Sequence, residues 1–254
     1  MKKLFKYVLN TVPRPLLIRL SYVVKPVVAM YYSGDRYTDP IDQKSYRSFL
    51  PYGYGKQRDN VLAPGTLSLE RHRLLWLFLK EKTNFFSAPL KVLHFAPEQA
   101  FYKRFRQLEN LEYTTTDLNS PLADVKADIC DLPFEDNSFD VILCNHVLEH
   151  IPNDKKAMQE LYRIMKPGGW GVFQIPQELD REITFEDDSI TDREERARIF
   201  GQYDHVRIYG RDYFDKLRSI GFRVEEEQMA ALMPKEKADT YRIDPKEIIP
   251  VVRK

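Results

Sequence analysis

The C-terminal two thirds of the chain alternates short apolar runs with helix-like segments, and this alternation restricts the fold most. The runs predicted to be strands are Val92–Phe95, Glu112–Thr116, Asp124–Asp128, Phe139–Asn145, Trp170–Ile175, Arg223–Met229 and Ile248–Arg253. Helices are predicted over Glu98–Leu108, Asp154–Lys166 and Asp212–Ile220. Strands that alternate with helices pair in parallel and bury both faces under helices, so the sequence predicts a doubly wound α/β sheet.

Composition agrees with one globular domain and an appendage. The 254 residues are 43% hydrophobic and 30% charged, and the net charge of +1 gives no reason to expect a nucleic-acid partner. The two cysteines, Cys130 and Cys144, form no C-x-x-C motif. Free thiols without a disulfide framework indicate a reducing compartment, and we expect a cytoplasmic protein.

Residues 1–34 mix apolar side chains with basic ones, and no acid precedes Asp35. The basic residues are Lys2, Lys3, Lys6, Arg14, Arg19 and Lys25. They interrupt every run that approaches the roughly 18 apolar residues of a membrane span. Two interpretations remain. The segment lies on the anionic inner face of a membrane, or it packs on the protein as a helical arm.

Three parts are expected along the chain. Residues 1–36 form the basic amphipathic segment, and residues 37–85 form a small module that ends in a helix, Ser68–Lys82, with Ser68 as its cap. Residues 86–254 form the α/β domain. Within it, residues 177–210 are mixed in charge and weakly periodic, which predicts a lid-like insertion.

Polar residues follow four of the predicted strands. These strand ends read Ala96-Pro97-Glu98, Thr116-Asp117, Asp128-Ile129 and Asn145-His146. In a doubly wound sheet the ligand binds at the carboxyl ends of the strands, so three acids are predicted to meet at one place. The first strand end lies in "KVLHFAPEQAF", residues 91–101, which contains no glycine.

The run "ADICDLPFEDNSFDVILCNHVLEHI", followed by "ELYRIMKPGG", resembles the class I S-adenosylmethionine-dependent methyltransferases. The closest group in this resemblance includes the quinone-biosynthesis methyltransferases, and residues 90–176 carry it. It implies a Rossmann-like seven-stranded sheet in the order 3-2-1-4-5-7-6, with strand 7 antiparallel. It also implies S-adenosyl-L-methionine as cofactor. This molecule has no phosphate, so carboxylates suit it better than the glycine-rich cradle that binds a pyrophosphate.

The resemblance assigns roles to the loop after the first strand. Against the family's D-x-G-x-G pattern, His94 takes the place of the acid, Ala96 that of the first glycine and Glu98 that of the second. Glu98 would meet the amino group of the cofactor directly or through water. The alternative is that Glu98 only favours the start of a helix.

Further cofactor contacts are implied at the other strand ends. Asp117, with Leu118 beside it, would hold the ribose hydroxyls, and Asp128 would accept from the adenine amino group with Ile129 against the ring. Asn145 would lie near the methyl group. The alternatives are a turn cap for Asp117 and a solvated loop acid for Asp128.

Methyl transfer depends mainly on alignment, and an oxygen or nitrogen nucleophile often needs a base. Candidate bases are His146, His150 and His205. Alternation in "DHVRIYG" places His205, Arg207 and Tyr209 on one face of an extended segment, where Arg207 would bind an acidic group of the acceptor. We predict catalytic roles for His146, His205, Arg207 and Tyr209. The alternative is that this segment braces the sheet.

"HVLEH", residues 146–150, matches the H-x-x-E-H pattern of zinc proteases. That chemistry requires both histidines on one face of a long helix. Here they follow a predicted strand, and Pro152 comes soon after. We therefore predict no metal site.

Some related bacterial methyltransferases carry two C-P-x-C zinc knuckles before an "SLERHR" stretch. The matching places here read "DPID" (Asp39–Asp42) and "APGT" (Ala63–Thr66). Because no thiolate remains, the module is predicted to fold without zinc. The aromatic side chains expected to hold it are Tyr37, Tyr46, Phe49, Tyr52 and Tyr54.

The function predicted is methyl transfer from S-adenosyl-L-methionine to a small-molecule or lipid-linked metabolite. A non-catalytic binding or scaffold protein on the same fold is the main alternative, since the glycine-free loop and the missing thiolates fit lost activity. Asp117 and Asp128 favour the enzyme. A nicotinamide-dependent oxidoreductase is a third possibility, but Glu98 would repel its pyrophosphate.

Overall fold

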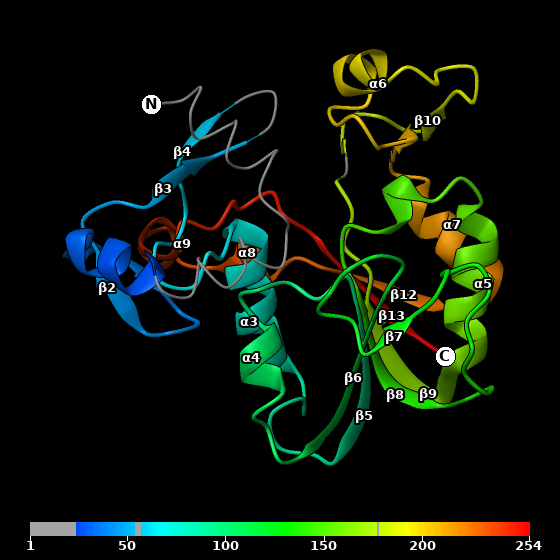
Figure 1. The fold of residues 1–254 in the computed structure, drawn as a ribbon, viewed down its shortest axis with the longest axis horizontal. Coiled ribbons are helices and arrows are strands. Elements are labelled where there is room, and N and C mark those ends of the chain that lie inside the picture. The colour runs from blue at the N-terminus through cyan, green and yellow to red at the C-terminus, as the bar shows by residue number, and fades with distance from the viewer. Residues whose placement is uncertain (1–23, 54–56, 177) are drawn as a thin grey trace.

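The computed structural model describes residues 24–53, 57–176 and 178–254 (Figure 1). Residues 1–23, most of the predicted basic segment, and Tyr54 lie outside this part. Membrane contact through residues 1–34 therefore stays a prediction. Within the described ranges no helix combines the length and the apolar character that crossing a bilayer requires.

The centre of the fold is a seven-stranded sheet in the order β12-β13-β9-β8-β5-β6-β7 (Figure 1). Its strands are β5 (Leu90–Phe95), β6 (Leu111–Asp117), β7 (Val125–Lys126), β8 (Phe139–Cys144), β9 (Met165–Val172), β12 (Arg223–Glu227) and β13 (Ile249–Arg253). The first five pair in parallel, and β13 runs antiparallel to both of its neighbours. Counted along the chain this order is 3-2-1-4-5-7-6 with strand 7 antiparallel, which confirms the predicted fold.

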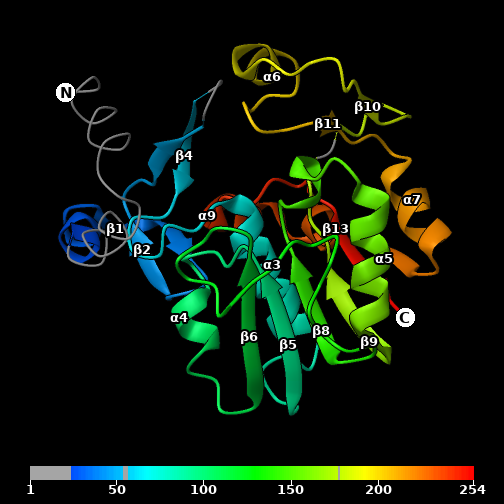
Figure 2. The same ribbon diagram turned by 45° about the vertical axis from the view of Figure 1, so that its right-hand side comes forward.

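Helices cover both faces of the sheet (Figures 1 and 2). One face carries α5 (Asp154–Ile164) and α7 (Tyr213–Ile220), and the other carries α3 (Glu70–Lys82), α4 (Tyr102–Phe105) and α8 (Met229–Leu232). A further helix, α9 (Lys235–Tyr241), contacts β1 of the N-terminal module. The last two helices, α8 and α9, were not predicted.

Alternate residues of β5 point to opposite layers, as a pleated strand requires. Leu93 and Phe95 are buried in the core under α5 and α7, and Val92 is buried in the core under α3 and α4. His94 points with Val92, is fully buried, and lies against the rings of Phe101 and Phe105.

Two predicted elements are much shorter than expected. The helix predicted over Glu98–Leu108 shortens to the single turn α4. Within this turn only Phe105 is buried against the core. The strand predicted over Asp124–Asp128 reduces to β7. There the carboxylate of Asp124 accepts from the backbone N–H and the hydroxyl of Thr115, and so ends the regular ladder.

Other boundaries shift at the "KPGG" turn and before α3. Helix α5 ends at Ile164, because Met165 already pairs with Phe139 as part of β9, and β9 ends at Val172 instead of at residue 175. Ser68 does not cap α3. The backbone N–H of Leu69 donates to Nδ1 of His72 at 3.1 Å instead.

The N-terminal module consists of two hairpins, β1 (Ser33–Asp39) with β2 (Lys44–Tyr46) and β3 (Leu50–Tyr52) with β4 (Arg58–Leu62). Residues 24–31 before it are helical. Its core contains Tyr37, Tyr46, Phe49 and Ala63. The prediction that Tyr52 belongs to this core is wrong, because its side chain lies on the edge hairpin and is 39% exposed.

The insertion carries β10 (Phe185–Glu186), α6 (Arg193–Ile199) and β11 (Arg207–Ile208). The two strands pair in an antiparallel hairpin. Figure 2 shows this unit above the carboxyl ends of the parallel strands, and its role as a lid stays a prediction.

Candidate active site

Two cavities lie side by side where the parallel strands end. The first, named here the strand-end cavity, has a volume of about 880 Å³. Its lining includes six predicted site residues: Ala96, Asp117, Leu118, Asp128, Ile129 and His146. Residues 202–204 of the insertion close one side. The sheet therefore gathers most of the predicted cofactor residues around one cavity, although they are up to 33 positions apart in the chain.

Ala96 has the backbone conformation that its place in the loop requires. Its φ of +45° lies in the left-handed region, which glycine adopts without strain. Its N–H donates to the carbonyl of Thr116 at 2.9 Å, so the turn is held against β6. The methyl side chain of Ala96 is small and leaves the backbone accessible to a ligand. A glycine, which the family pattern has at this position, would do the same.

Asp117 and Asp128 are fixed by the backbone of their own loops. Oδ1 of Asp117 accepts from the N–H groups of Asn119 and Ser120 at 2.7 and 2.6 Å. Oδ1 of Asp128 accepts from the N–H of Cys130 at 2.8 Å. The contacts of Asp117 correspond to the turn cap that was the alternative for this residue. The backbone contacts of both acids hold each carboxylate at the cavity wall, where a second oxygen is available to a ligand.

His94, Glu98 and Asn145 form a buried polar group next to the strand-end cavity. Nε2 of His94 lies 2.5 Å from Oε2 of Glu98, and Nδ1 of His94 lies 2.7 Å from the hydroxyl of Tyr113. Nδ2 of Asn145 donates to Oε1 of Glu98 at 3.3 Å. None of the three is among the lining residues of either cavity, and the Glu98 side chain keeps 15% of its surface exposed.

The Glu98 carboxylate is held in its charged form. Burial opposes its ionisation, but the charge and hydrogen bond of His94, with a contribution from His72, outweigh burial and lower the pKa of Glu98 to about 2. A permanent negative charge therefore sits behind the loop that carries Ala96.

The second cavity, named here the polar cavity, has a volume of about 600 Å³. It shares His146, His150 and Gln202 with the strand-end cavity. Its other charged or titratable lining residues include Arg58, Glu70, Arg71, Glu149, His205, Asp244, Lys246 and Glu247. Three of its buried atoms have no hydrogen-bond partner among the described residues: Nε of Arg71, Nε2 of His146 and Oε2 of Glu149. Buried polar atoms of folded proteins normally have a partner, which can be water, an ion or a ligand.

Four groups of the polar cavity have shifted pKa values: His146, Glu149, His205 and Glu247. Burial lowers the pKa of His146, and the charge of Arg71 adds to this effect, so its imidazole is neutral at pH 7. Burial also raises the pKa of Glu247 to about 7, although nearby Arg71 opposes the shift. His146 is moreover held at φ +54°.

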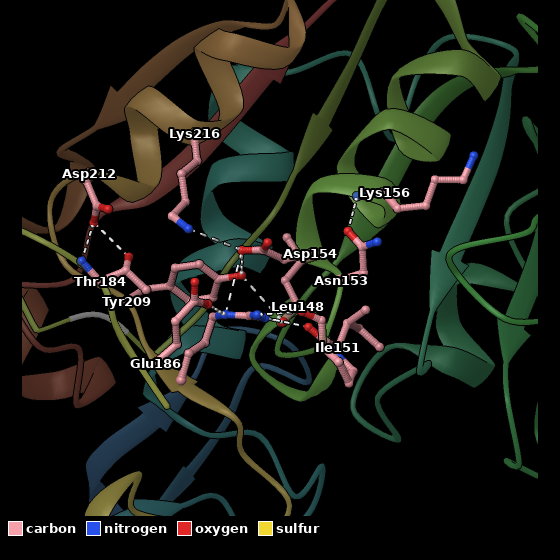
Figure 3. Close-up of polar contacts among 12 residues, drawn as sticks. Leu148, Ile151, Asn153, Asp154, Lys156, Thr184, Glu186, Tyr209, Asp212 and Lys216 are labelled. Carbon is pink, nitrogen blue, oxygen red and sulfur yellow. Dashed lines mark hydrogen bonds and ion pairs between the residues drawn. The ribbon is translucent and has the colours of Figure 1, made fainter. Parts of the chain in front are cut away.

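Arg207 and Tyr209 contact the turn that carries residues 148–152, and neither residue lines one of the two cavities. The Arg207 guanidinium donates to the carbonyls of Leu148, Ile151 and Pro152 at 3.1, 2.5 and 2.9 Å. In Figure 3 the Tyr209 hydroxyl points to Asp154, to which it donates at 2.8 Å.

The structure adds Arg71, Glu149 and Glu247 to the site, and sequence reasoning assigned no role to any of them. Arg71 lies in a segment rich in Leu, Trp and Phe that predicts a buried helix. A charged residue in such a helix could have indicated a functional role. Glu149 was visible in "VLEH". Nothing local marks Glu247, which reaches the cavity from the segment before β13.

Residues 90–173 match the family described as "Methyltransferase domain". The chain is similar to the sterol 4-C-methyltransferase strm-1 of Caenorhabditis elegans, with 34% identity over 84 residues, 33% of this chain and 23% of the relative. It is also similar to the ubiquinone/menaquinone biosynthesis C-methyltransferase UbiE of Brucella canis, with 47% identity over 45 residues, 18% of this chain and 17% of the relative. The matched part thus spans less than a quarter of either relative.

The fold resembles that of a solved [4+2]-cyclase, SpnF, with a TM-score of 0.50 and 14% identity, over 85% of this chain and 91% of the cyclase. This likeness concerns the fold alone. The cofactor of the matched family is S-adenosyl-L-methionine, and the carboxylates fixed at the strand ends fit its ribose and adenine donors. Residues 90–173 therefore match a methyltransferase domain, and the sheet order is that of the class I S-adenosylmethionine-dependent methyltransferase fold.

Proposed function

We propose that the protein transfers the methyl group of S-adenosyl-L-methionine to a small-molecule or lipid-linked acceptor bound in the polar cavity. The observation that carries this proposal is that His146 lines both cavities. A donor in one cavity and an acceptor in the other would meet beside it. Such a junction supplies the alignment on which methyl transfer depends.

The strand-end cavity would hold the nucleoside. Asp117 would accept from the ribose hydroxyls, and Asp128 would accept from the adenine amino group with Ile129 against the ring. The side chain of Leu118, 62% exposed in the structure, would cover the nucleoside. These roles follow the family and are supported by the presence of all four residues in the lining of one cavity.

The methionine end of the cofactor would lie near Ala96 and Glu98. Each oxygen of the Glu98 carboxylate accepts one hydrogen bond from His94 or Asn145, so each keeps a lone pair for an ammonium group or a bridging water. Arg71 would face the carboxylate of the cofactor or an acidic group of the acceptor, since its Nε is buried and unpartnered in the described part of the protein.

The acceptor would be activated from the polar cavity. His146 is neutral at pH 7 and its Nε2 has no partner among the described residues, so it can accept a proton from a hydroxyl or amine. His205, buried on the same cavity, is a second candidate base. For Arg207 and Tyr209 the contacts favour positioning of residues 148–152 over contact with the acceptor.

The names of the two relatives support the acceptor class. One name states a sterol, and the other states the biosynthesis of ubiquinone or menaquinone. Both are lipid-like molecules. The matched segments are short, so this part of the proposal concerns a class and not a compound.

Calorimetric titration with S-adenosylhomocysteine, the demethylated cofactor, tests the proposal. We expect a Kd of roughly micromolar order, about −8 kcal/mol. Asp117→Ala should weaken binding at least tenfold. Asp117→Asn keeps an acceptor for the turn and should lose less. Asp131→Asn, an exposed acid outside both cavities, is the control and should bind normally. A folded protein that binds no cofactor would support the scaffold alternative instead.

A further inference from the structure

We propose that Glu149, His150 and His205 form a binding site for a divalent transition-metal ion, such as Zn²⁺, on the wall of the polar cavity. The three side chains each offer a ligand atom, and these atoms lie within 4.8 Å of one another. Glu149 and His150 belong to the short helix η1 (Leu148–His150), and His205 comes from the insertion. All three line the polar cavity.

Both histidines are oriented as metal ligands usually are. Nδ1 of His150 lies 3.2 Å from the carbonyl oxygen of Asp204, and Nδ1 of His205 lies 3.2 Å from the carbonyl oxygen of Phe200. A carbonyl only accepts, so each Nδ1 carries the proton. The lone pair of each ring is then on Nε2. A backbone partner that fixes the tautomer in this way is the usual outer contact of a ligating histidine.

Glu149 supplies an independent observation. Its side chain is almost fully buried, and one oxygen, Oε1, lies 3.2 Å from Nδ1 of His146. The other oxygen, Oε2, is buried with no partner among the residues that the structure describes. A buried carboxylate oxygen without a donor is costly, and a cation would satisfy it.

The donor set indicates the class of metal. Two imidazoles and one carboxylate suit Zn²⁺ and other late first-row ions, and a site with three protein ligands keeps a position for an exogenous oxygen. Ligands at bonds of about 2.1 Å lie roughly 3–3.5 Å apart, so small side-chain rotations would close the site around an ion. The rings of His150 and His205 already cross at 84° with centroids 4.7 Å apart.

This site differs from the zinc-protease pattern in "HVLEH". There both histidines of the motif bind the metal and the glutamate acts as base. Here Nδ1 of His146 contacts Glu149, and the second imidazole comes from His205, 55 positions after His150. The prediction of no metal weighed only the local motif and could not include a ligand from the insertion.

A metal at this place would bind a hydroxyl or enol oxygen of the acceptor and lower its pKa, which favours the nucleophile. This consequence rests on the proposed function. The metal site itself does not, because it is defined by the protein's own side chains.

The test is calorimetric titration of the chelator-treated full chain with Zn²⁺, together with the absorption spectrum of the Co²⁺ form. We expect one ion per chain with a Kd below about 10 µM. Glu149→Gln and His205→Asn should each weaken binding at least thirtyfold. In His205→Asn the side-chain amide can still donate to the carbonyl of Phe200, so we expect this variant to fold normally. Circular dichroism checks this.

Two matched controls separate the site from adventitious binding. Asp204→Asn changes the acid beside His150 that is not a proposed ligand, and Cys130→Ser removes the partly exposed thiol. Both should bind Zn²⁺ as the wild type does. Equal affinity of the Glu149 and His205 variants, or no stoichiometric ion in the wild type, would overturn the proposal.

The same variants should bind S-adenosylhomocysteine normally, because neither Glu149 nor His205 lines the strand-end cavity. Metal binding without cofactor binding would reject the proposed function and keep the metal site. Cofactor binding without metal binding would reject the metal site and keep the proposed function.

Discussion

His94 and Glu98 form a buried pair, with Nε2 and Oε2 2.5 Å apart, at two positions where the family pattern has an acid and a glycine. Compared with that pattern, the acidic residue Glu98 lies in the loop after β5, and His94 stands near the end of β5 at the position of the acid. The pair keeps a negative charge beside the cofactor loop without glycine. Its electrostatics lead to a pH prediction.

Glu98→Gln should flatten the acid limb of the stability profile. The pKa of Glu98 is lowered from 4.5 to about 2, so the ionised form stabilises the fold. This contribution is complete above about pH 4.5 and disappears as the pH falls toward 2, and it amounts to at most about 3 kcal/mol. Urea unfolding between pH 3 and 6 should therefore show a smaller fall for the variant. An identical fall in both proteins would contradict the pairing.

Ala96→Gly should stabilise the protein and keep cofactor binding. At φ +45° alanine is strained and glycine is not, so the free energy of unfolding should rise by about 0.5–1 kcal/mol. Ala96→Val places a branched side chain at the same strained position in the cavity wall. It should lower stability and weaken S-adenosylhomocysteine binding at least tenfold. Urea unfolding and calorimetry measure the two effects, and a destabilising glycine would argue against the loop conformation.

Arg207→Lys should be destabilising although it conserves the charge. The guanidinium is 3% exposed and donates to three carbonyls and to Glu186, a geometry that one ammonium group cannot reproduce. We expect a loss of about 2–3 kcal/mol in urea unfolding. Glu186→Gln is the control, because its side chain is 48% exposed and should contribute less than about 0.5 kcal/mol. An equal loss of unfolding free energy in the two variants would contradict the role of Arg207 in holding residues 148–152.

Thr66→Val should destabilise the N-terminal module. Asp39 is fully buried, and its Oδ2 accepts from the hydroxyls of Thr66 and Ser68. Asp39 and Thr66 stand at two of the places that the predicted knuckle resemblance gives to cysteines, and a hydrogen bond between their side chains joins the two segments. Loss of one donor to a buried carboxylate should cost about 1.5–3 kcal/mol in urea unfolding.

The control for this prediction is Thr38→Val. The Thr38 hydroxyl lies 2.9 Å from that of Ser45 in a partly buried pair of neutral groups, so we expect a loss of about 1 kcal/mol or less. A Thr66 variant as stable as this control would show that the buried carboxylate does not depend on its donor.

The seven strands of the sheet and the helices α5 and α7 could be predicted because hydrophobic periodicity is a local property. The same reasoning placed Asp117 and Asp128 at strand ends, and a parallel sheet then gathers strand ends on one edge. The full sheet order came from the family resemblance. Element ends were less certain. Met165 joins β9 because Phe139 lies beside it, and this pairing is not visible in a local window.

The sequence by itself therefore determined the class of fold, the methyltransferase resemblance of residues 90–173 and the acids of the strand-end cavity. Only the tertiary structure decided which groups face each other across distant segments: His205 beside Glu149, Arg71 in the polar cavity, and Arg207 as a brace. The physical reason is that long-range contacts depend on how the insertion and α3 pack over the sheet. That packing is set by burial and hydrogen bonding summed over the whole molecule, and no short segment encodes it.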